Sequence, residues 1–328
     1  MTKSGTILFV AVHSLLTGIC AQDPVSSHFY ANSLQLNPSL AGIEGPSKVY
    51  IGYRNQWPNS GSAYITYQAS YDQYVEKLHG GLGVNVFNDM QGDGVFNTYN
   101  LNVMYAYHFQ ATRRLFFSGG MQAGVGQRSF DPSSLVFGDM IDPVSGGISP
   151  GLTELIGYSK FYPDFSTGIS AFSGIFYGGI AMHHIFSPVF TDKSDPEGTI
   201  PRKYTGHIGA MIPIYEKRSG REIMQLSPGL VAIRQQSVHQ INYGLDLLYR
   251  NFFGGVWTRH DLVFNYGNII FTAGYVSGNL RFRYSYDIKL LSPTIRLKNM
   301  GAHEFSLLII NYKSDRRKNR RAIKIPKI

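Results

Sequence analysis

The sequence contains 328 residues with a formal net charge of +9, yet only 16% of them are Asp, Glu, Lys or Arg. Aromatic residues make up 14%, and 36 residues are glycine. No run of about 18 apolar residues is present, which excludes a helical membrane protein, and a 43% hydrophobic content excludes a disordered chain. This composition favours a β-rich chain with little water-facing surface.

The basic excess lies at the C-terminus, because residues 313–328 contain eight Lys or Arg and one acid. The remaining body is close to neutral, so we expect no nucleic-acid partner. The tail is either a solvated end or an electrostatic contact with an acidic periplasmic partner or cell-wall carboxylates. The residues proposed for that contact are Arg316, Arg317, Lys318, Arg320 and Arg321.

The N-terminus has the features of an export signal. Lys3 supplies a positive charge, residues 6–19 are mostly apolar, and Ala21 offers a small residue for cleavage. We therefore predict a signal peptide over residues 1–21. Cys20 raises a lipoprotein alternative, but Ile19 does not suit the position before a lipidated cysteine.

Alternation of polar and apolar residues dominates the rest of the chain. It is clearest in residues 62–74, 95–108, 240–250 and 279–288, where one parity is aromatic or aliphatic and the other polar. Such a two-residue period predicts two-faced β-strands. We expect fourteen strands, near residues 47–57, 62–74, 78–88, 95–108, 114–127, 163–172, 174–185, 203–214, 221–235, 237–250, 252–260, 267–275, 279–288 and 303–312.

These strands match the roughly 9–11 residues that a tilted strand needs to cross a bilayer. The long connections all follow odd-numbered strands and the tight ones follow even-numbered strands, which is typical of an outer-membrane barrel with periplasmic termini. The predicted fold is thus an all-β, transmembrane antiparallel β-barrel of about 14 strands, with 12 to 16 left open. An exported soluble sandwich or propeller is the alternative.

The polar face would be costly in a packed soluble core, whereas a water-containing lumen tolerates it. We predict that the lumen is lined by Arg54, Asp72, Asp246, Arg250, Arg281, Arg283 and Asp287. Because the first and last strands become neighbours on closure, Arg54 and Gln56 are expected to join Asp72 or Glu304 in a mainly stabilising network. The predicted organisation is a signal peptide over 1–21, a periplasmic segment over 22–46, a barrel over 47–312 and a basic periplasmic tail over 313–328.

Motifs that could carry chemistry do not support an enzyme. Residues 147–151 match G-x-S-x-G, but Pro150 removes an N–H that the oxyanion hole requires. His183 and His184 are adjacent on a predicted strand, so they should point to opposite faces and not share a metal. Asp139 and Asp142, in the longest connection, suit a turn as well as a calcium site. We expect no catalysis, no metal and no cofactor.

Several segments together resemble one family of proteins. These segments are Asn37–Gly42, Tyr53–Pro58, Ser70–Asp72, Gly80–Val84, Tyr105–His108, Phe137–Pro143, Tyr284–Asp287 and Gly301–Leu307. In this order they resemble the PorP/SprF family of the type IX secretion system of Bacteroidetes. The terminal Pro326-Lys327-Ile328 departs from the Pro-Arg-Phe ending that relatives often have.

The resemblance implies a non-enzymatic outer-membrane barrel that assists secretion or surface anchoring of cargo, in some members adhesins for gliding motility. Implied partners are the translocon, periplasmic components, secreted cargo with a C-terminal sorting domain, and outer-membrane lipid. Cargo would contact the long connections, chiefly residues 128–162, 186–202 and 289–302. The alternative function is a diffusion channel or transporter for small solutes.

Overall fold

The computed structural model describes residues 23–58, 64–136, 140–142, 145–147, 156–190, 198–216, 222–261, 267–289 and 301–311. Its strands are β1 (Ser47–Gln56), β2 (Tyr64–Val75), β3 (Gly80–Gln91), β4 (Phe96–Gln110), β5 (Leu115–Phe130), β6 (Tyr158–Ser173), β7 (Phe176–His183), β8 (Lys203–Ala210), β9 (Ile212–Glu216), β10 (Glu222–Gln235), β11 (Val238–Tyr249), β12 (Phe252–Asp261), β13 (Asn268–Ser277), β14 (Leu280–Lys289) and β15 (Gly301–Asn311). The short helices are α2 (Ser33–Leu36), η1 (Pro38–Leu40), η2 (Glu76–Leu78) and η3 (Pro132–Ser134). None of these helices is long and apolar enough to cross a bilayer.

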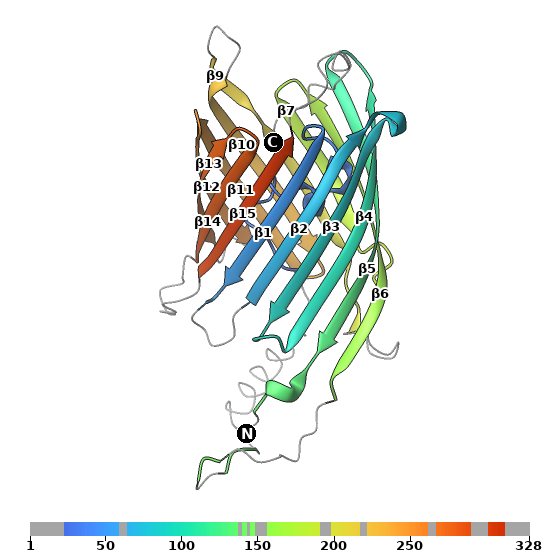
Figure 1. Ribbon diagram of the computed structural model, residues 1–328, viewed down its shortest axis with the longest axis vertical. Helices are drawn as coiled ribbons and strands as arrows, with labels where there is room; N and C mark the ends of the chain where they lie inside the picture. Colours follow the sequence, from blue (N-terminus) through green and yellow to red (C-terminus); the bar gives the residue numbers. More distant parts are fainter. Residues whose placement is uncertain are drawn as a thin grey trace, which may run out of the picture.

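The strands form one antiparallel sheet that closes on itself (Figure 1). β1 pairs with β2 on one side and with β15 on the other, where Ser47 lies opposite Asn311. β8 and β9 both pair with β10 and are separated by Met211, so they form one interrupted strand. Over the described residues the barrel thus has fourteen strands, as predicted, and pairing of the first with the last removes the edges of the sheet.

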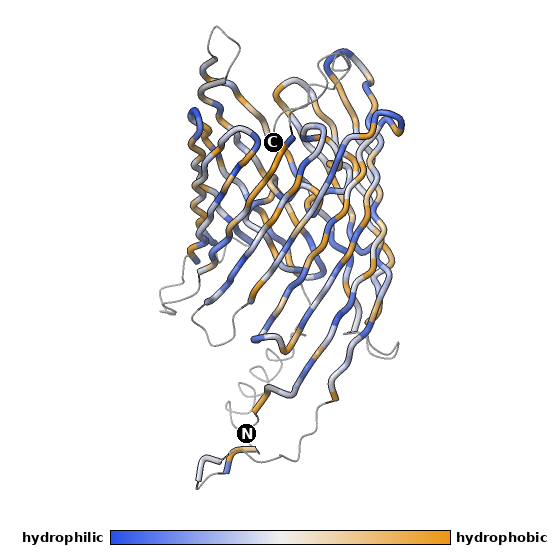
Figure 2. The backbone as a smooth tube through the Cα atoms, in the orientation of Figure 1, coloured by the Kyte–Doolittle hydropathy of each residue, from blue (hydrophilic) through white to orange (hydrophobic). Residues whose placement is uncertain are grey.

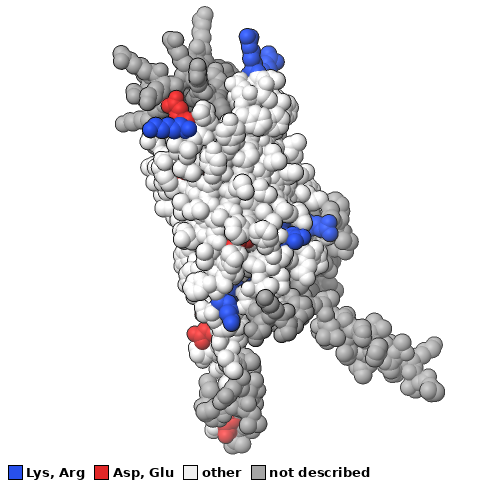
Figure 3. Space-filling view, turned by 90° about the vertical axis from the view of Figure 1, so that its right-hand side faces the viewer, with Lys and Arg blue, Asp and Glu red and all other residues white. Residues whose placement is uncertain are grey.

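Hydrophobic and hydrophilic residues alternate along the strands of the wall, as the two-residue period predicted (Figure 2). In β4, Tyr99, Leu101 and Val103 are 48–54% exposed on the outer face, whereas Asn102 and His108 are buried on the inner face. The face of the wall shown in Figure 3 carries few charged side chains. An outer surface of this kind matches hydrocarbon better than water.

Most strand ends lie within three residues of the predicted positions, and the exception is the start of β6. We expected this strand to begin near Pro163. The structure starts it at Tyr158, which pairs with Phe130 of β5. β7 pairs with β6 only from Thr167 onward, so Pro163 lies where β6 is an edge, and proline is tolerated there.

The two ends of the barrel differ in the length of their connections. Residues 131–157, 184–202 and 290–300 connect strands at one end, which we call the loop end. Short connections such as 111–114 and 174–175 lie at the other end, which we call the turn end. β1 begins and β15 ends at the turn end. Long and short connections therefore segregate as predicted.

Residues 23–46 lie inside the barrel, and we call them the plug (Figure 1). Its first residue, Asp23, contacts Lys203 at the loop end, and its last residue leads into β1 at the turn end. Leu34, Leu40 and Ala41 are at most 1% exposed. The plug therefore runs through the lumen from the loop end to the turn end.

This position corrects the prediction that the segment lies in the periplasm. Phe29 and Leu40 of the plug pack in one hydrophobic cluster with Phe172 and Trp257 of the wall. The plug sequence has no strand or helix period, so the sequence offered no sign of what it packs against. The predicted signal peptide (1–21) and basic tail (313–328) lie outside the described residues.

Candidate functional site

A buried ion-pair network joins the plug to the wall near the loop end. Arg54 of β1 donates from Nη2 to Asp287 of β14 at 2.9 Å and from Nη1 to Glu304 of β15 at 3.0 Å. Ser27 of the plug donates through its backbone N to Glu304 at 2.7 Å and through Oγ to Asp287 at 2.8 Å. Arg259 of β12 donates to Asp287 at 3.1 Å. We call these five residues the arginine network.

The sequence suggested part of this network, since Arg54 and Glu304 were expected to meet once the barrel closed. The structure brings them together but leaves Asp72 out, because Asp72 lies near the opposite end of β2. Ser27 and Arg259 were not foreseen. The plug sequence has no regular polar and apolar repeat from which the position of Ser27 could be predicted. Arg259 could be recognised only as a charged residue at a position of β12 that faces the lumen.

A second group of buried charges lies at the turn end. Lys48 of β1 has its Nζ 3.6 Å from carboxylate oxygens of both Glu44 and Asp72. Arg281 of β14 donates from Nη1 to Glu44 at 2.8 Å, and Asp72 also accepts the backbone N–H of Gly42 at 2.9 Å. Each plug charge is thus paired with a wall charge of opposite sign, as buried ions require.

Toward the turn end, wall glycines make room for the plug backbone. A Cβ atom at Gly120 would overlap the backbone N of Ser39, and one at Gly81 would overlap the carbonyl of Ala41. Glycine is required at such a close approach because any side chain would displace the neighbouring backbone. The wall is therefore shaped for this plug.

Asn37 satisfies polar groups of both plug and wall. Its Oδ1 accepts the N–H of Ser39 at 3.0 Å, and its Nδ2 donates to Ser170 Oγ at 3.2 Å and to the carbonyl of Ile180 at 3.1 Å. Asn37 is fully buried. A buried amide with this many partners positions the plug against β6 and β7.

The segments that carry the family resemblance meet in space. Asn37–Gly42 contacts Ser70–Asp72 through Asp72, Gly80–Val84 through Gly81, and Tyr105–His108 through His108, whose Nε2 donates to the carbonyl of Ala41 at 2.9 Å. Tyr53–Pro58, Tyr284–Asp287 and Gly301–Leu307 meet in the arginine network. These segments are therefore mainly contacts within the wall and between wall and plug.

The other predicted lumenal residues have separate positions. Asp246 accepts a hydrogen bond from Nε1 of Trp257 at 2.9 Å, and Arg283 lies over the ring of Phe253, 4.3 Å from its centroid. Arg250 was wrongly assigned to the lumen. It occupies the connection after β11 with φ = 56°, is exposed, and lies over the ring of Tyr249. The left-handed backbone ends the alternation on which the prediction relied.

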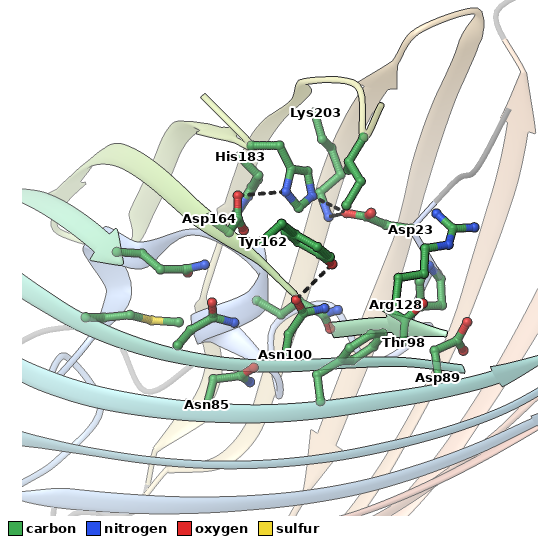
Figure 4. Close-up of a pocket in the computed structure, with 18 of the residues that line it drawn as sticks. Asp23, Asn85, Asp89, Thr98, Asn100, Arg128, Tyr162, Asp164, His183 and Lys203 are labelled. Carbon is green, nitrogen blue, oxygen red and sulfur yellow. Dashed lines mark hydrogen bonds and ion pairs between the residues drawn. The ribbon is translucent and has the colours of Figure 1, made fainter. Parts of the chain in front are cut away.

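A polar cavity of about 80 Å³, which opens to solvent, lies between the plug and the inner face of β3–β8 toward the loop end (Figure 4). Its walls carry side-chain amides, hydroxyls and charges in place of the apolar residues found deeper in the lumen. The residues that line it include Asp23, Asn85, Asp89, Thr98, Asn100, Asn102, Gln122, Arg128, Tyr162, Asp164, His183, His184 and Lys203.

Both histidines at the end of β7 line this cavity, which corrects the expectation of opposite faces. His184 has φ = 55°, so its side chain turns back into the lumen. Its Nδ1 bonds Asp164 at 2.9 Å and its Nε2 bonds Asp23 at 3.0 Å. Burial opposes the charged form, but the two carboxylates prevail and raise the pKa of His184, just beyond the strand, to about 9.

Several buried polar atoms of the cavity have no hydrogen-bond partner among the described residues. They are Nδ2 of Asn85, Oδ1 of Asn102, Nε of Arg128 and Nε2 of His183. Buried polar groups are normally hydrogen-bonded, so water or polar groups of another molecule would be needed to satisfy these atoms.

The predicted partner-binding residues Arg316, Arg317, Lys318, Arg320 and Arg321 lie outside the described residues, as does Asp139. Asp142 forms a local turn, accepting the N–H of Ser145 at 2.7 Å.

Comparisons with known proteins were made for sequence and for fold. Residues 19–309 match the family described as type IX secretion system membrane protein PorP/SprF. No curated protein sequence matches the chain.

Among solved structures, the toluene transporter TbuX of Ralstonia pickettii is 11% identical, with a TM-score of 0.48 over 84% of this chain and 92% of that one. The CymD monoaromatic hydrocarbon channel is 12% identical, with a TM-score of 0.48 over 89% and 96%. Omp33 of Acinetobacter baumannii is 8% identical, with a TM-score of 0.45 over 82% and 100%.

The family match extends from the plug through nearly all of the wall, and it includes both the arginine network and the contacts of Asn37. It also places the barrel in the outer membrane, in accord with its apolar outer face. The chain belongs to the PorP/SprF family of type IX secretion system membrane proteins.

Proposed function

We propose that this protein is a non-enzymatic surface anchor that holds a secreted protein at the outer membrane after its passage through the secretion system. The observation that carries the proposal is the shape of the lumen. The plug fills it toward the turn end, while the polar cavity remains at the loop end. This arrangement favours a receptor for a partner over a conduit for solutes.

The buried contacts of the plug support this function over a diffusion channel. To open a pore, the plug would have to leave Asp287 and Glu304 without Ser27, and Asp72 without the N–H of Gly42. Separating buried groups that are charged and hydrogen-bonded costs several kcal/mol. A solute channel would have no use for so many fixed contacts across its path.

The loop end also carries exposed apolar side chains that suit a protein partner. Ile156, Phe161 and Phe186 are 88%, 70% and 72% exposed. They lie in or beside the connections 128–162 and 186–202, in which we expected cargo contacts. Exposed apolar groups next to a polar cavity provide the mixed surface that protein interfaces use.

The basic tail has a separate proposed role. We assign Arg316, Arg317, Lys318, Arg320 and Arg321 to an electrostatic contact with an acidic periplasmic partner. Truncation after residue 312 should then weaken co-purification of periplasmic components, most strongly at low salt, and leave surface cargo attached.

Deletion of the gene tests the anchoring function. Surface proteins and proteins in the medium would be quantified in the wild-type and deletion strains, with the gene restored as a control. We expect one or a few secreted proteins to move from the surface to the medium or to accumulate in the periplasm. If no secreted protein changes its location while uptake of a small solute falls, the anchoring function is wrong and the channel alternative gains support.

Conductance of the purified barrel in a planar bilayer is the second test. The plugged lumen predicts no steady pore. A stable open conductance in the wild-type protein would contradict the proposal.

A further inference from the structure

A groove crosses the outer face of the barrel over β6, β7, β8, β10 and β11. It borders about 1170 Å³ of space, part of it open to the surroundings. Its lining consists of Thr167, Gly168, Ile169, Ile180, Ala181, Met182, Tyr204, Thr205, Gly206, Ala232, Ile233, Arg234, His239, Gln240 and Ile241.

The groove arises because one row of outward-facing residues is small at its centre. Gly206 lies opposite Ile180 on one side and opposite Ala232 on the other, and Ala232 lies opposite Ile241. A Cβ atom at Gly206 would meet nothing within 4 Å. The two isoleucines therefore form the walls of a depression whose floor is Gly206 and Ala232.

The adjacent row, one step toward the loop end, is polar and cationic. Arg234 lies opposite Tyr204 on β8 and opposite His239 on β11. Arg202 precedes this row at the same end and is also exposed. Arg234 is exposed and has no acceptor among the described residues of the chain, and no carboxylate lines the groove. Among the residues that the structure describes, a guanidinium without an acidic partner thus lies at one end of an apolar depression.

We propose that this groove binds a phosphorylated membrane lipid, with an acyl chain over Gly206 and Ala232 and the phosphate against Arg234 and His239. Both parts of such a lipid match the groove, because the apolar depression can pack against an acyl chain and the guanidinium of Arg234 can pair with a phosphate. Arg234 lies two residues before the turn that joins β10 to β11, at the level where a strand leaves the hydrocarbon. A lipid headgroup lies at that same level.

The test is native mass spectrometry of the full barrel in detergent after incubation with phosphatidylglycerol, an anionic phospholipid, and an equal amount of zwitterionic phosphatidylcholine. Wild-type protein should retain phosphatidylglycerol in preference. Arg234→Gln should weaken retention about fivefold, since one arginine near a membrane surface contributes roughly 1 kcal/mol. Gly206→Leu should weaken it by filling the depression.

Two variants serve as matched controls. Arg250→Gln removes an exposed arginine at the opposite end of the barrel, the turn end. Gly119→Leu replaces an outward-facing glycine of β5, where a Cβ atom meets nothing within 4 Å. Both should retain the lipid as wild type does, and heat-dependent gel mobility would show that each variant is folded. Equal retention of the two lipids, equal loss in the controls, or a protein subunit bound at this face in place of lipid would each overturn the proposal.

Discussion

The two ends of the plugged lumen are built differently. Around Asn37 and Lys48, toward the turn end, glycines admit the plug backbone and polar groups of plug and wall hydrogen-bond each other. Around Asn85 and Arg128, toward the loop end, polar atoms surround a cavity without partners. At the turn end the contacts hold the plug against the wall, whereas at the loop end plug and wall leave a polar cavity between them.

The largest expected effect is the loss of a charge from the arginine network. Arg54→Met leaves Asp287 and Glu304 with an uncompensated negative charge, so we expect unfolding free energy to fall by about 3–5 kcal/mol. Urea unfolding in detergent micelles would measure it. The control Arg250→Met, at an exposed arginine, should change stability by less than about 0.5 kcal/mol. Equal effects of the two variants would show that the network does not hold the plug.

A side chain at a wall glycine should displace the plug. Gly120→Val overlaps the backbone of Ser39, so we expect a loss of about 3 kcal/mol or the appearance of ion conductance. Gly119→Val is the matched control, because Gly119 is the adjacent residue on the outer face and a Cβ there meets nothing within 4 Å. Wild-type stability and a closed lumen in Gly120→Val would argue against a tightly fitted plug.

Asparagine substitutions compare the two ends directly. Asn37→Leu leaves the N–H of Ser39 without its side-chain acceptor and removes the hydrogen bonds to Ser170 and Ile180, so it should cost about 2–3 kcal/mol. Asn85→Leu removes an unpartnered Nδ2, so stability should stay within about 1 kcal/mol of wild type. Thermal unfolding would measure both. If the anchoring proposal holds, Asn85→Leu should also release the secreted partner from the surface. A stable Asn85→Leu protein that still retains its partner would show that the cavity is not needed for anchoring.

The smallest expected effect concerns pH. Because the folded-state pKa of His184 is about 9, above the ordinary 6.5, its contribution is full below pH 6.5 and is lost as pH rises through 9. The start of the plug, where Asp23 bonds His184, should therefore loosen at high pH. Hydrogen exchange at residues 23–28 would detect this. His184→Gln should abolish the pH dependence, and an unchanged dependence in that variant would assign it to another group.

Sequence reasoning succeeded where a local rule applies. Alternation located the fourteen strands, and their parity placed Arg54, Asp72 and Asp287 on the inner face, where the structure has them. It failed where the backbone departs from the extended conformation that the alternation assumes. Arg250 and His184 both have positive φ at the ends of strands, so their side chains do not follow the parity of the strand before them.

The plug could not be foreseen in the same way. Residues 23–46 alternate with neither a two-residue nor a 3.6-residue period, and their burial comes from the wall around them. A signal was nevertheless present, since Asn37–Gly42 and the glycines near residue 81 belong to segments that carry the family resemblance. Their contact could be recognised only once the barrel had closed around the plug.

The order of residues by itself determined the two-faced strands, and it favoured a barrel over a soluble sandwich because the inner face carries charges and the long connections all follow odd-numbered strands. Only the tertiary structure decided what fills that barrel. Ion pairs such as Arg54 with Glu304 join residues far apart in the chain, and their geometry exists only once the first and last strands pair and the plug lies between them.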